Sequence, residues 1–171
     1  PKGRWWVGSV TADKSRADAA LYRLTGDGEV RKIFGGLLTS NGAGFSADYS
    51  RFYHADTPSH ALSVYPYDVE SGTLGEGKIL HQFEHGTGRP DGGAADEEGC
   101  YWSALFDGGR VVRLSPDGKI LETVEIPAKR PTMIGFGGAD RKTAFVTSAR
   151  TGLTDEELQS QPLSGGIFTF R

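Results

Sequence analysis

Short runs of alternating apolar and polar residues, separated by turns that contain glycine, make up most of the chain. Clear examples are residues 61–68, 109–114 and 120–126. Alternation with a period of two residues is typical of half-buried β-strands, whereas an amphipathic helix repeats its apolar positions every three to four residues. The pattern therefore predicts an all-β chain built from many short strands.

One segment, residues 154–159, departs from the strand pattern. Thr154 is followed three residues later by Glu157, which is the capping-box arrangement found at the start of a helix. The segment is too short to form a layer of the fold. We expect a single helical turn within a surface loop.

The strand pattern repeats along the chain. Segments of glycine and other small residues begin at Asn41, Asp91 and Thr132, and each is followed by a polar turn and an aromatic run. A repeat of about 40 to 50 residues with four strands is typical of a β-propeller blade. Small residues suit the first strand of a blade, because these strands crowd together around the central axis. The repeat therefore favours a propeller over a sandwich.

The repeat divides the chain into a partial blade at 1–38, blades at 39–85 and 86–128, and a partial final blade at 129–171. The expected strand counts are three, four, four and three, so that one partial propeller domain covers about 3.5 blades of antiparallel strands. The first blade lacks its first strand and the last blade lacks its fourth. Open strand edges and apolar blade faces favour association. We therefore expect further N-terminal blades or a second chain to close the ring.

Composition and charge exclude several classes of function. The 171 residues include 19 basic and 22 acidic side chains and carry a formal charge of −3, which disfavours a nucleic acid or an anionic membrane as partner. Cys100 is the only cysteine, so neither an internal disulfide nor a cysteine metal cluster can form. The sequence has no apolar run of about 18 residues and no signal-peptide pattern. We expect a soluble cytoplasmic protein.

Several catalytic and binding motifs are absent from the sequence. Residues 86–92 are rich in glycine but lack the spacing and the following helix of a dinucleotide-binding fingerprint. The sequence has no Gly-x-Ser-x-Gly elbow and no His-Glu-x-x-His motif. The acidic loop at 152–159 lacks the alternating ligands of an EF-hand. Nucleotide binding and serine hydrolase or zincin chemistry are therefore unsupported.

A set of motifs, taken in order, resembles the SMP-30/gluconolactonase/luciferin-regenerating family. The motifs are GRPDG at 88–92, YWSA at 101–104, GGRVVRLSPDG at 108–118, FGGAD at 136–140 and FVTSAR at 145–150. Each motif is weak alone, but their order is specific and the resemblance extends from residue 3 to residue 170. It implies a six-bladed propeller of four-stranded blades. It also implies a lactonase of carbohydrate metabolism that depends on a divalent cation.

The resemblance assigns two metal ligands to this sequence. They are Asn41, within Ser-Asn-Gly, and Asp91, within Pro-Asp-Gly, while a third ligand of the family, a glutamate, would precede Pro1. Carboxylate and amide oxygens suit hard divalent cations, so Ca²⁺ is expected first, with Zn²⁺ or Mn²⁺ as alternatives. Asp13 lies near the place where some members have an acid that contacts the substrate. We expect a weak metal affinity from two ligands alone.

The proposed ligands suggest a route to lactone hydrolysis. A cation can polarise a lactone carbonyl and lower the pKa of a bound water, and Asp91 is the expected catalytic residue that accepts the proton. The alternative is structural, because Asn-Gly and Asp-Gly are also the strongest hairpin-turn dipeptides. Residues 48–50, 97–99 and 140–142 already supply the expected hairpin turns. Metal ligation is therefore the preferred interpretation for Asn41 and Asp91.

Three further residues are expected on the entrance side of the site. His85 and Arg89 precede Asp91 in the same loop, and Thr132 begins the next repeat. Each could contact a polyhydroxylated substrate. The alternatives are a solvated loop position for His85 and local pairing for Arg89 and Thr132.

The sequence thus favours a sugar lactonase of the gluconolactonase type that is active when the missing blades are present. A propeller is also a common binding scaffold, so a non-catalytic role in binding a small ligand or protein remains open. A related hydrolase acting on other esters is a second alternative. Loss of lactone hydrolysis with EDTA would favour the enzyme, whereas ligand binding that survives Asp91→Ala would favour the scaffold.

Overall fold

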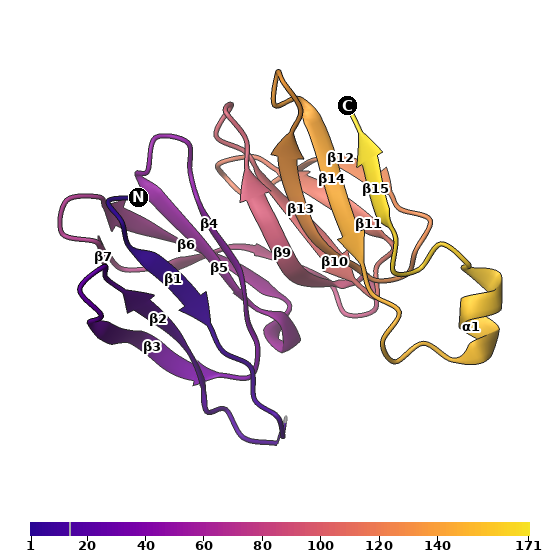
Figure 1. The fold of residues 1–171 in the computed structure, drawn as a ribbon, viewed down its shortest axis with the longest axis horizontal. Helices are drawn as coiled ribbons and strands as arrows, with labels where there is room; N and C mark the ends of the chain where they lie inside the picture. The colour runs from indigo at the N-terminus through magenta and orange to yellow at the C-terminus, as the bar shows by residue number, and fades with distance from the viewer. Residues whose placement is uncertain (14) are drawn as a thin grey trace.

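The computed structural model describes residues 1–13 and 15–171, and this part folds into four antiparallel sheets that follow one another along the chain (Figure 1). The all-β prediction is confirmed. The first two sheets contain β1 (Trp5–Gly8), β2 (Ala19–Leu24), β3 (Val30–Leu37), β4 (Ser40–Phe45), β5 (Arg51–Asp56), β6 (Ala61–Asp68), β7 (Thr73–Leu74) and β8 (Lys78–Gln82). The other two contain β9 (Arg89–Ala95), β10 (Tyr101–Phe106), β11 (Arg110–Leu114), β12 (Ile120–Glu125), β13 (Pro131–Gly137), β14 (Thr143–Ser148) and β15 (Ile167–Phe170).

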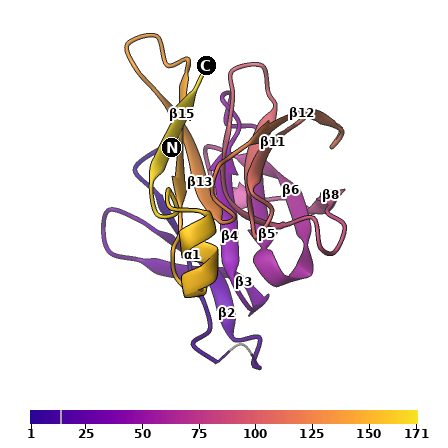
Figure 2. The ribbon, with the colours of Figure 1, turned by 90° about the vertical axis from the view of Figure 1, so that its right-hand side faces the viewer.

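The first, third and fourth sheets pair their strands in the order in which they occur in the sequence, as expected for propeller blades. Figure 2 shows the outer strands β8 and β12 on the side away from β13. The second sheet holds five strands among the described residues, one more than predicted, because β7 and β8 both pair with β6. The eight-residue β6 is longer than β8 can cover, and the pairs Tyr67–Leu74 and Asp68–Thr73 satisfy its far end.

Adjacent sheets pack face to face, and the period-two alternation of each strand sends its side chains into two different cores. In β10, Tyr101 and Leu105 pack with the second sheet, whereas Trp102 and Ala104 pack with the fourth. The interior between the second and third sheets is formed by Tyr53, Ala55, Leu62, Val64, Phe83, Tyr101, Leu105, Val112 and Leu114. A strand buried on both faces explains why all residues from Tyr101 to Leu105 are buried.

The two ends of the sheets differ in their connections. The turns between the first and second strands lie at the upper end in Figure 1, and Tyr49, Gly99 and Arg141 each adopt positive φ there. The lower end carries the longer connections, including η1 (Thr57–Ser59) and α1 (Asp155–Ser160). The predicted capping box of α1 is present, because Thr154 accepts from Glu157 N and Glu157 accepts from Thr154 N.

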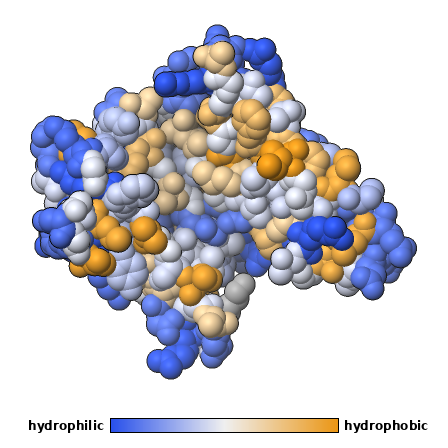
Figure 3. Space-filling model, in the orientation of Figure 1, coloured by the Kyte–Doolittle hydropathy of each residue, from blue (hydrophilic) through white to orange (hydrophobic). Residues whose placement is uncertain are grey.

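The outward faces of the first and last sheets expose apolar side chains, which Figure 3 shows in orange over both sides of this view. Trp5 is 71% exposed on β1 and Ile167 is 68% exposed on β15, while Trp102, between two sheets, is only 6% exposed. Apolar exposure of this extent favours a covering partner. Neither length nor hydropathy allows any helix of the described residues to cross a bilayer.

Candidate functional site

The innermost strands of three successive sheets are irregular at matching positions near the lower end. The register shifts after Asn41 in β4, opposite Ala104 in the pairing of β9 with β10, and between Pro131 and Met133 in β13. A β-bulge bends its strand and re-aims the side chain at that point, and bulges are frequent next to active sites. Asp91 and Thr132 lie within their bulges, and Asn41 directly precedes the bulge of β4; these three residues begin the sequence repeats.

The structure brings Asn41 and Asp91 together. Asn41 Nδ2 donates a hydrogen bond of 2.6 Å to Asp91 Oδ1, although the residues belong to different sheets and are 50 positions apart in sequence. Both side chains are partly buried. The two predicted ligands thus face each other at the inner ends of neighbouring sheets, as the repeat suggested. Their role as metal ligands stays a prediction.

Thr57 joins this pair from η1. Its side chain accepts a hydrogen bond of 2.9 Å from Asn41 Nδ2, and its hydroxyl donates one of 2.8 Å to the carbonyl oxygen of Pro90. Thr57 is only 8% exposed. A single buried hydroxyl therefore connects the innermost strands of the second and third sheets beside the two predicted ligands.

Two stacked tyrosines lie next to the strand that carries Asn41. The rings of Tyr53 and Tyr101 have centroids 4.5 Å apart, and the Tyr101 hydroxyl donates a 2.7 Å hydrogen bond to the Gly42 carbonyl. Burial raises the pKa of Tyr101 above its ordinary value, so the phenol is neutral and acts as a donor. A Cβ at Gly93 would collide with Trp102 O and with Tyr101 Oη. Glycine thus lets the strand that carries Asp91 approach β10 closely.

Burial raises the pKa of Asp91 to about 6, and the positive charge of Arg89 acts in the opposite direction. No lysine, arginine or histidine within residues 1–13 and 15–171 forms an ion pair with Asp91. A charged carboxylate at this place therefore lacks a bonded cation. Such a position is costly for a carboxylate unless a positive charge is supplied.

The donor atoms at this place fit a hard divalent cation. Asp91 Oδ2 takes part in no hydrogen bond of the described residues, and both N–H groups of Asn41 are used by Thr57 and Asp91, which leaves Asn41 Oδ1 free to coordinate. A carboxylate oxygen and an amide oxygen are the ligands that Ca²⁺ prefers. The described residues contain no group of three or more His, Cys, Asp or Glu side chains arranged to hold a metal. Other ligands would have to complete the coordination sphere.

The four predicted substrate residues have other partners in the structure. Arg89 pairs with Asp107, and the Thr132 and Thr147 hydroxyls lie 2.8 Å apart. His85 packs on His60 with ring centroids 4.1 Å apart. Asp13 is exposed and accepts hydrogen bonds from Ser15 N and Ser15 Oγ, which lower its pKa. No hydrogen bond of the described residues joins any of the four to Asn41 or Asp91, so their contact with substrate stays a prediction.

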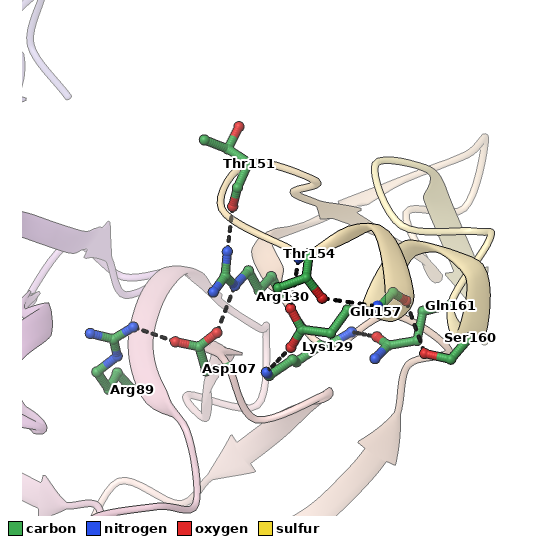
Figure 4. A network of polar contacts seen from close by, with 9 residues as sticks. All are labelled: Arg89, Asp107, Lys129, Arg130, Thr151, Thr154, Glu157, Ser160 and Gln161. Carbon is green, nitrogen blue, oxygen red and sulfur yellow. Dashed lines mark hydrogen bonds and ion pairs between the residues drawn. The ribbon is translucent and has the colours of Figure 1, made fainter.

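Arg89 belongs to a polar network between the third and fourth sheets (Figure 4). Asp107 binds Arg89 through one carboxylate oxygen and Arg130 Nε through the other, the latter at 2.6 Å. Both guanidinium groups lie over the Phe106 ring, at 5.2 and 5.0 Å from its centroid. Arg130 also donates to Thr151 O. Two arginines share one aspartate, which leaves the cluster with a net positive charge.

Sequence reasoning missed Thr57, Tyr101 and the Arg130–Asp107 pair. Thr57 directly follows the second strand of its blade and precedes a proline. A polar residue at the end of that strand was the signal that the sequence offered. Its partner Pro90 lies 33 positions away, and Tyr101 lies 59 positions from Gly42. Neither contact joins equivalent positions of two repeats, so the repeat does not predict them.

Residues 1–150 match the family described as "SMP-30/Gluconolactonase/LRE-like region". The chain is 45% identical to a 6-deoxy-6-sulfogluconolactonase of Pseudomonas putida over 172 residues, which is 100% of this chain and 59% of that protein. It is 37% identical to human regucalcin over 174 residues, which is 98% of this chain and 58% of regucalcin.

Two solved structures resemble the fold closely. The crystal structure of the calcium-binding protein regucalcin from Agrobacterium tumefaciens superposes with a TM-score of 0.94 and 30% identity, over 99% of this chain and 58% of that one. A luciferin-regenerating enzyme gives a TM-score of 0.89 with 30% identity, again over 99% of this chain and 58% of the other. These matches confirm the propeller fold. The 171 residues span somewhat less than three fifths of the length of these proteins.

Proposed function

Because the chain belongs to the SMP-30/gluconolactonase/LRE-like family, we propose that the complete protein is a lactonase that hydrolyses a sugar lactone with the help of one divalent cation. The observation that carries the proposal is the pairing of Asn41 with Asp91 at 2.6 Å, at the bulged inner ends of neighbouring sheets. Ca²⁺ is the cation that the oxygen donors suit best, with Zn²⁺ and Mn²⁺ as alternatives.

Each residue has a defined task in this proposal. Asn41 Oδ1 and Asp91 Oδ2 bind the cation, which when present polarises the lactone carbonyl and acidifies the attacking water. Asp91 is also the catalytic residue that takes the proton of that water. Burial of the pair between two sheets restricts access of bulk water and so strengthens the electrostatic contribution of both side chains.

The relative at 45% identity, which is named for a lactone carrying a sulfonate, supports a sugar lactone as the substrate class. The Arg89–Asp107–Arg130 cluster lies at the same end of the sheets and carries two guanidinium groups for one carboxylate. Arg89 also acts on Asp91 through its charge. A six-carbon aldonolactone, with or without an anionic group, is therefore the substrate to test first.

The test measures acid release from gluconolactone and from 6-deoxy-6-sulfogluconolactone by the complete protein at neutral pH. We expect EDTA to abolish the enzymatic rate above the spontaneous one, and one of Ca²⁺, Zn²⁺ or Mn²⁺ to restore it. Asp91→Ala is expected to lower kcat/KM by at least about a thousandfold and Asn41→Ala by about ten- to a hundredfold. A metal-free protein or an Asp91→Ala variant with the wild-type rate would overturn the proposal. Lactone binding without hydrolysis would indicate a scaffold instead.

A further inference from the structure

Thr57 is held firmly between the second and third sheets. Its backbone N–H donates to Thr39 O at 3.1 Å, and its carbonyl accepts from His60 N at 3.3 Å. Thr57 is the first residue of η1, and Pro58 follows it with a restricted backbone. Thr57 is buried, with 8% of the residue exposed. Its hydroxyl therefore has a fixed place rather than a choice of rotamers in water.

The direction of the two Thr57 hydrogen bonds is determined by proton count. A hydroxyl has one proton, and Thr57 donates it to Pro90 O at 2.8 Å, since a carbonyl can only accept. Toward Asn41, 2.9 Å away, the Thr57 oxygen can then only accept. Asn41 must consequently present an N–H to Thr57 and not its amide oxygen.

The same count fixes the rest of the Asn41 amide. Its second N–H points to Asp91 Oδ1, so both donors are used and Oδ1 faces away from Thr57 and Asp91. A rotated amide would place Oδ1 against two oxygens that have no proton to offer. Thr57 and Asp91 together therefore leave one orientation in which every group is satisfied.

We propose that Thr57 is a positioning residue that orients the Asn41 amide oxygen toward the divalent cation and couples this orientation to the strand carrying Asp91. The coupling runs through Pro90, the residue directly before Asp91, whose carbonyl receives the Thr57 proton. This inference rests on the proposed function for the presence of a cation. Thr57 touches neither the substrate nor the cation in this role. Residues that orient metal ligands in this way commonly change metal affinity by ten- to a hundredfold when replaced.

The test uses Thr57→Val, which keeps the side-chain shape and removes the hydroxyl, in the complete protein. We expect the Kd for Ca²⁺, measured by isothermal titration calorimetry, to rise at least about tenfold. Thr57→Ser retains the hydroxyl and is expected to restore the Kd to within about twofold of wild type. An unchanged Kd in Thr57→Val, or no rescue by serine, overturns the proposal.

Thr11→Val is the matched control. Thr11 is 6% exposed, lies shortly after β1, and donates its hydroxyl proton to Leu38 O at 3.3 Å, while no hydrogen bond of the described residues joins it to Asn41. The Kd for Ca²⁺ is expected to stay at the wild-type value. If Thr11→Val raises the Kd as much as Thr57→Val does, the loss of any interstrand hydrogen bond is enough to weaken Ca²⁺ binding. That result would overturn a specific role for Thr57.

A second measurement separates this inference from the proposed function. In the metal-free protein, the side-chain N–H₂ signals of Asn41, assigned by their loss in Asn41→Ala, report the two hydrogen bonds directly. We expect the proton that faces Thr57 to shift upfield in Thr57→Val and to return in Thr57→Ser. A wild-type protein that binds no divalent cation would end the proposed function, whereas unchanged Asn41 signals in Thr57→Val would end the role of Thr57.

Discussion

β9 and β13 begin alike and differ in chemistry. Both are innermost strands with a bulge near their start, and the bulge re-aims Asp91 in β9 and Thr132 in β13. Asp91 receives a hydrogen bond from Asn41 of the preceding sheet, whereas Thr132 pairs with Thr147 of its own sheet. The backbone thus places a side chain at this end of both sheets. The residue type decides whether that side chain hydrogen bonds to the preceding sheet or to its own sheet.

The packing beneath the two strands differs as well. A Cβ on Gly93 of β9 would collide with Trp102 and Tyr101, while a Cβ on Gly135 of β13 would meet no described atom within 4 Å. β9 is thus in close contact with β10 at Gly93, whereas β13 leaves space at Gly135. If close packing holds the site geometry, an added methyl group should be costly at Gly93 and tolerated at Gly135.

The largest effect is expected from Gly93→Ala. The added methyl would overlap Trp102 O, which is backbone and cannot move aside, so we expect a loss of about 3 kcal/mol in the free energy of unfolding. Gly135→Ala in β13 is expected to change it by less than about 0.5 kcal/mol. Urea unfolding of both variants measures the difference. Equal losses of unfolding free energy in the two variants would show that the close contacts around Gly93 do not account for the loss.

The next effect concerns pH and the second sheet. His54 is 3% exposed, hydrogen bonds Ser40 at 2.8 Å, and burial lowers its pKa from 6.5 to about 4. Because the unfolded state binds the proton first, the contribution of His54 is fully present above about pH 6.5 and is lost as pH falls toward 4. The resulting loss in the free energy of unfolding approaches about 3 kcal/mol. Urea unfolding at pH 7 and pH 4.5 measures it.

The third sheet carries Ala104 opposite its bulge, where the second sheet carries His54. Alanine does not titrate, so the acid sensitivity at this position should belong to the second sheet. We expect His54→Gln to flatten the dependence of stability on pH between 7 and 4.5. An equally steep dependence in this variant would assign the acid effect to other groups.

A smaller effect distinguishes the two stacked tyrosines. Tyr101→Phe removes the donor to Gly42 O and leaves that carbonyl without its partner, so we expect a loss of about 1 to 2 kcal/mol in unfolding free energy. The Tyr53 hydroxyl is buried without a hydrogen-bond partner among the described residues. Tyr53→Phe should therefore be neutral or slightly stabilising. If Tyr53→Phe costs as much as Tyr101→Phe, the hydrogen bond to Gly42 is not the cause of the loss.

The fold was predictable from the sequence because strand alternation and the blade repeat are local signals. The alternation at 61–68 marks a strand that the structure places at Ala61–Asp68, and the Thr154–Glu157 pair marks the start of α1. The short strand β7 was not predicted. Its formation depends on how far β6 extends beyond β8, which is a property of the assembled sheet and not of the residues Thr73 and Leu74.

The candidate site was predictable only in part, for the same reason. Asn41 and Asp91 occupy equivalent positions of two repeats, so the repeat itself indicated that they meet. Thr57 reaches them from a different strand end, and only the packing of η1 against β9 brings it there. Arg89 was expected on the entrance side of the site, with substrate contact or local pairing as its role, and Asp107, from a connection that the repeat leaves undefined, pairs with it. Repeats thus predict equivalent positions, and the connections between strands supply the rest.

The smallest effect concerns α1, the fourth sheet's counterpart of η1. Both elements connect the second and third strands of a sheet, yet η1 brings Thr57 to Asn41, whereas α1 contacts Lys129 through Glu157. Thr154→Ala removes one half of the capping box and is expected to destabilise α1 by about 1 kcal/mol. Faster amide hydrogen exchange within α1 is the measurement.

The Kd for Ca²⁺ in Thr154→Ala tests whether the two connections act separately. No hydrogen bond of the described residues joins α1 to Asn41, Asp91 or Thr57, so the Kd is expected to stay at the wild-type value while α1 exchanges faster. A higher Kd for Ca²⁺ in Thr154→Ala would mean that the Arg130–Asp107 network transmits the change from α1 to the site. In that case the fourth sheet, which lacks an acid or amide at its bulge, would still contribute to metal binding through its connection.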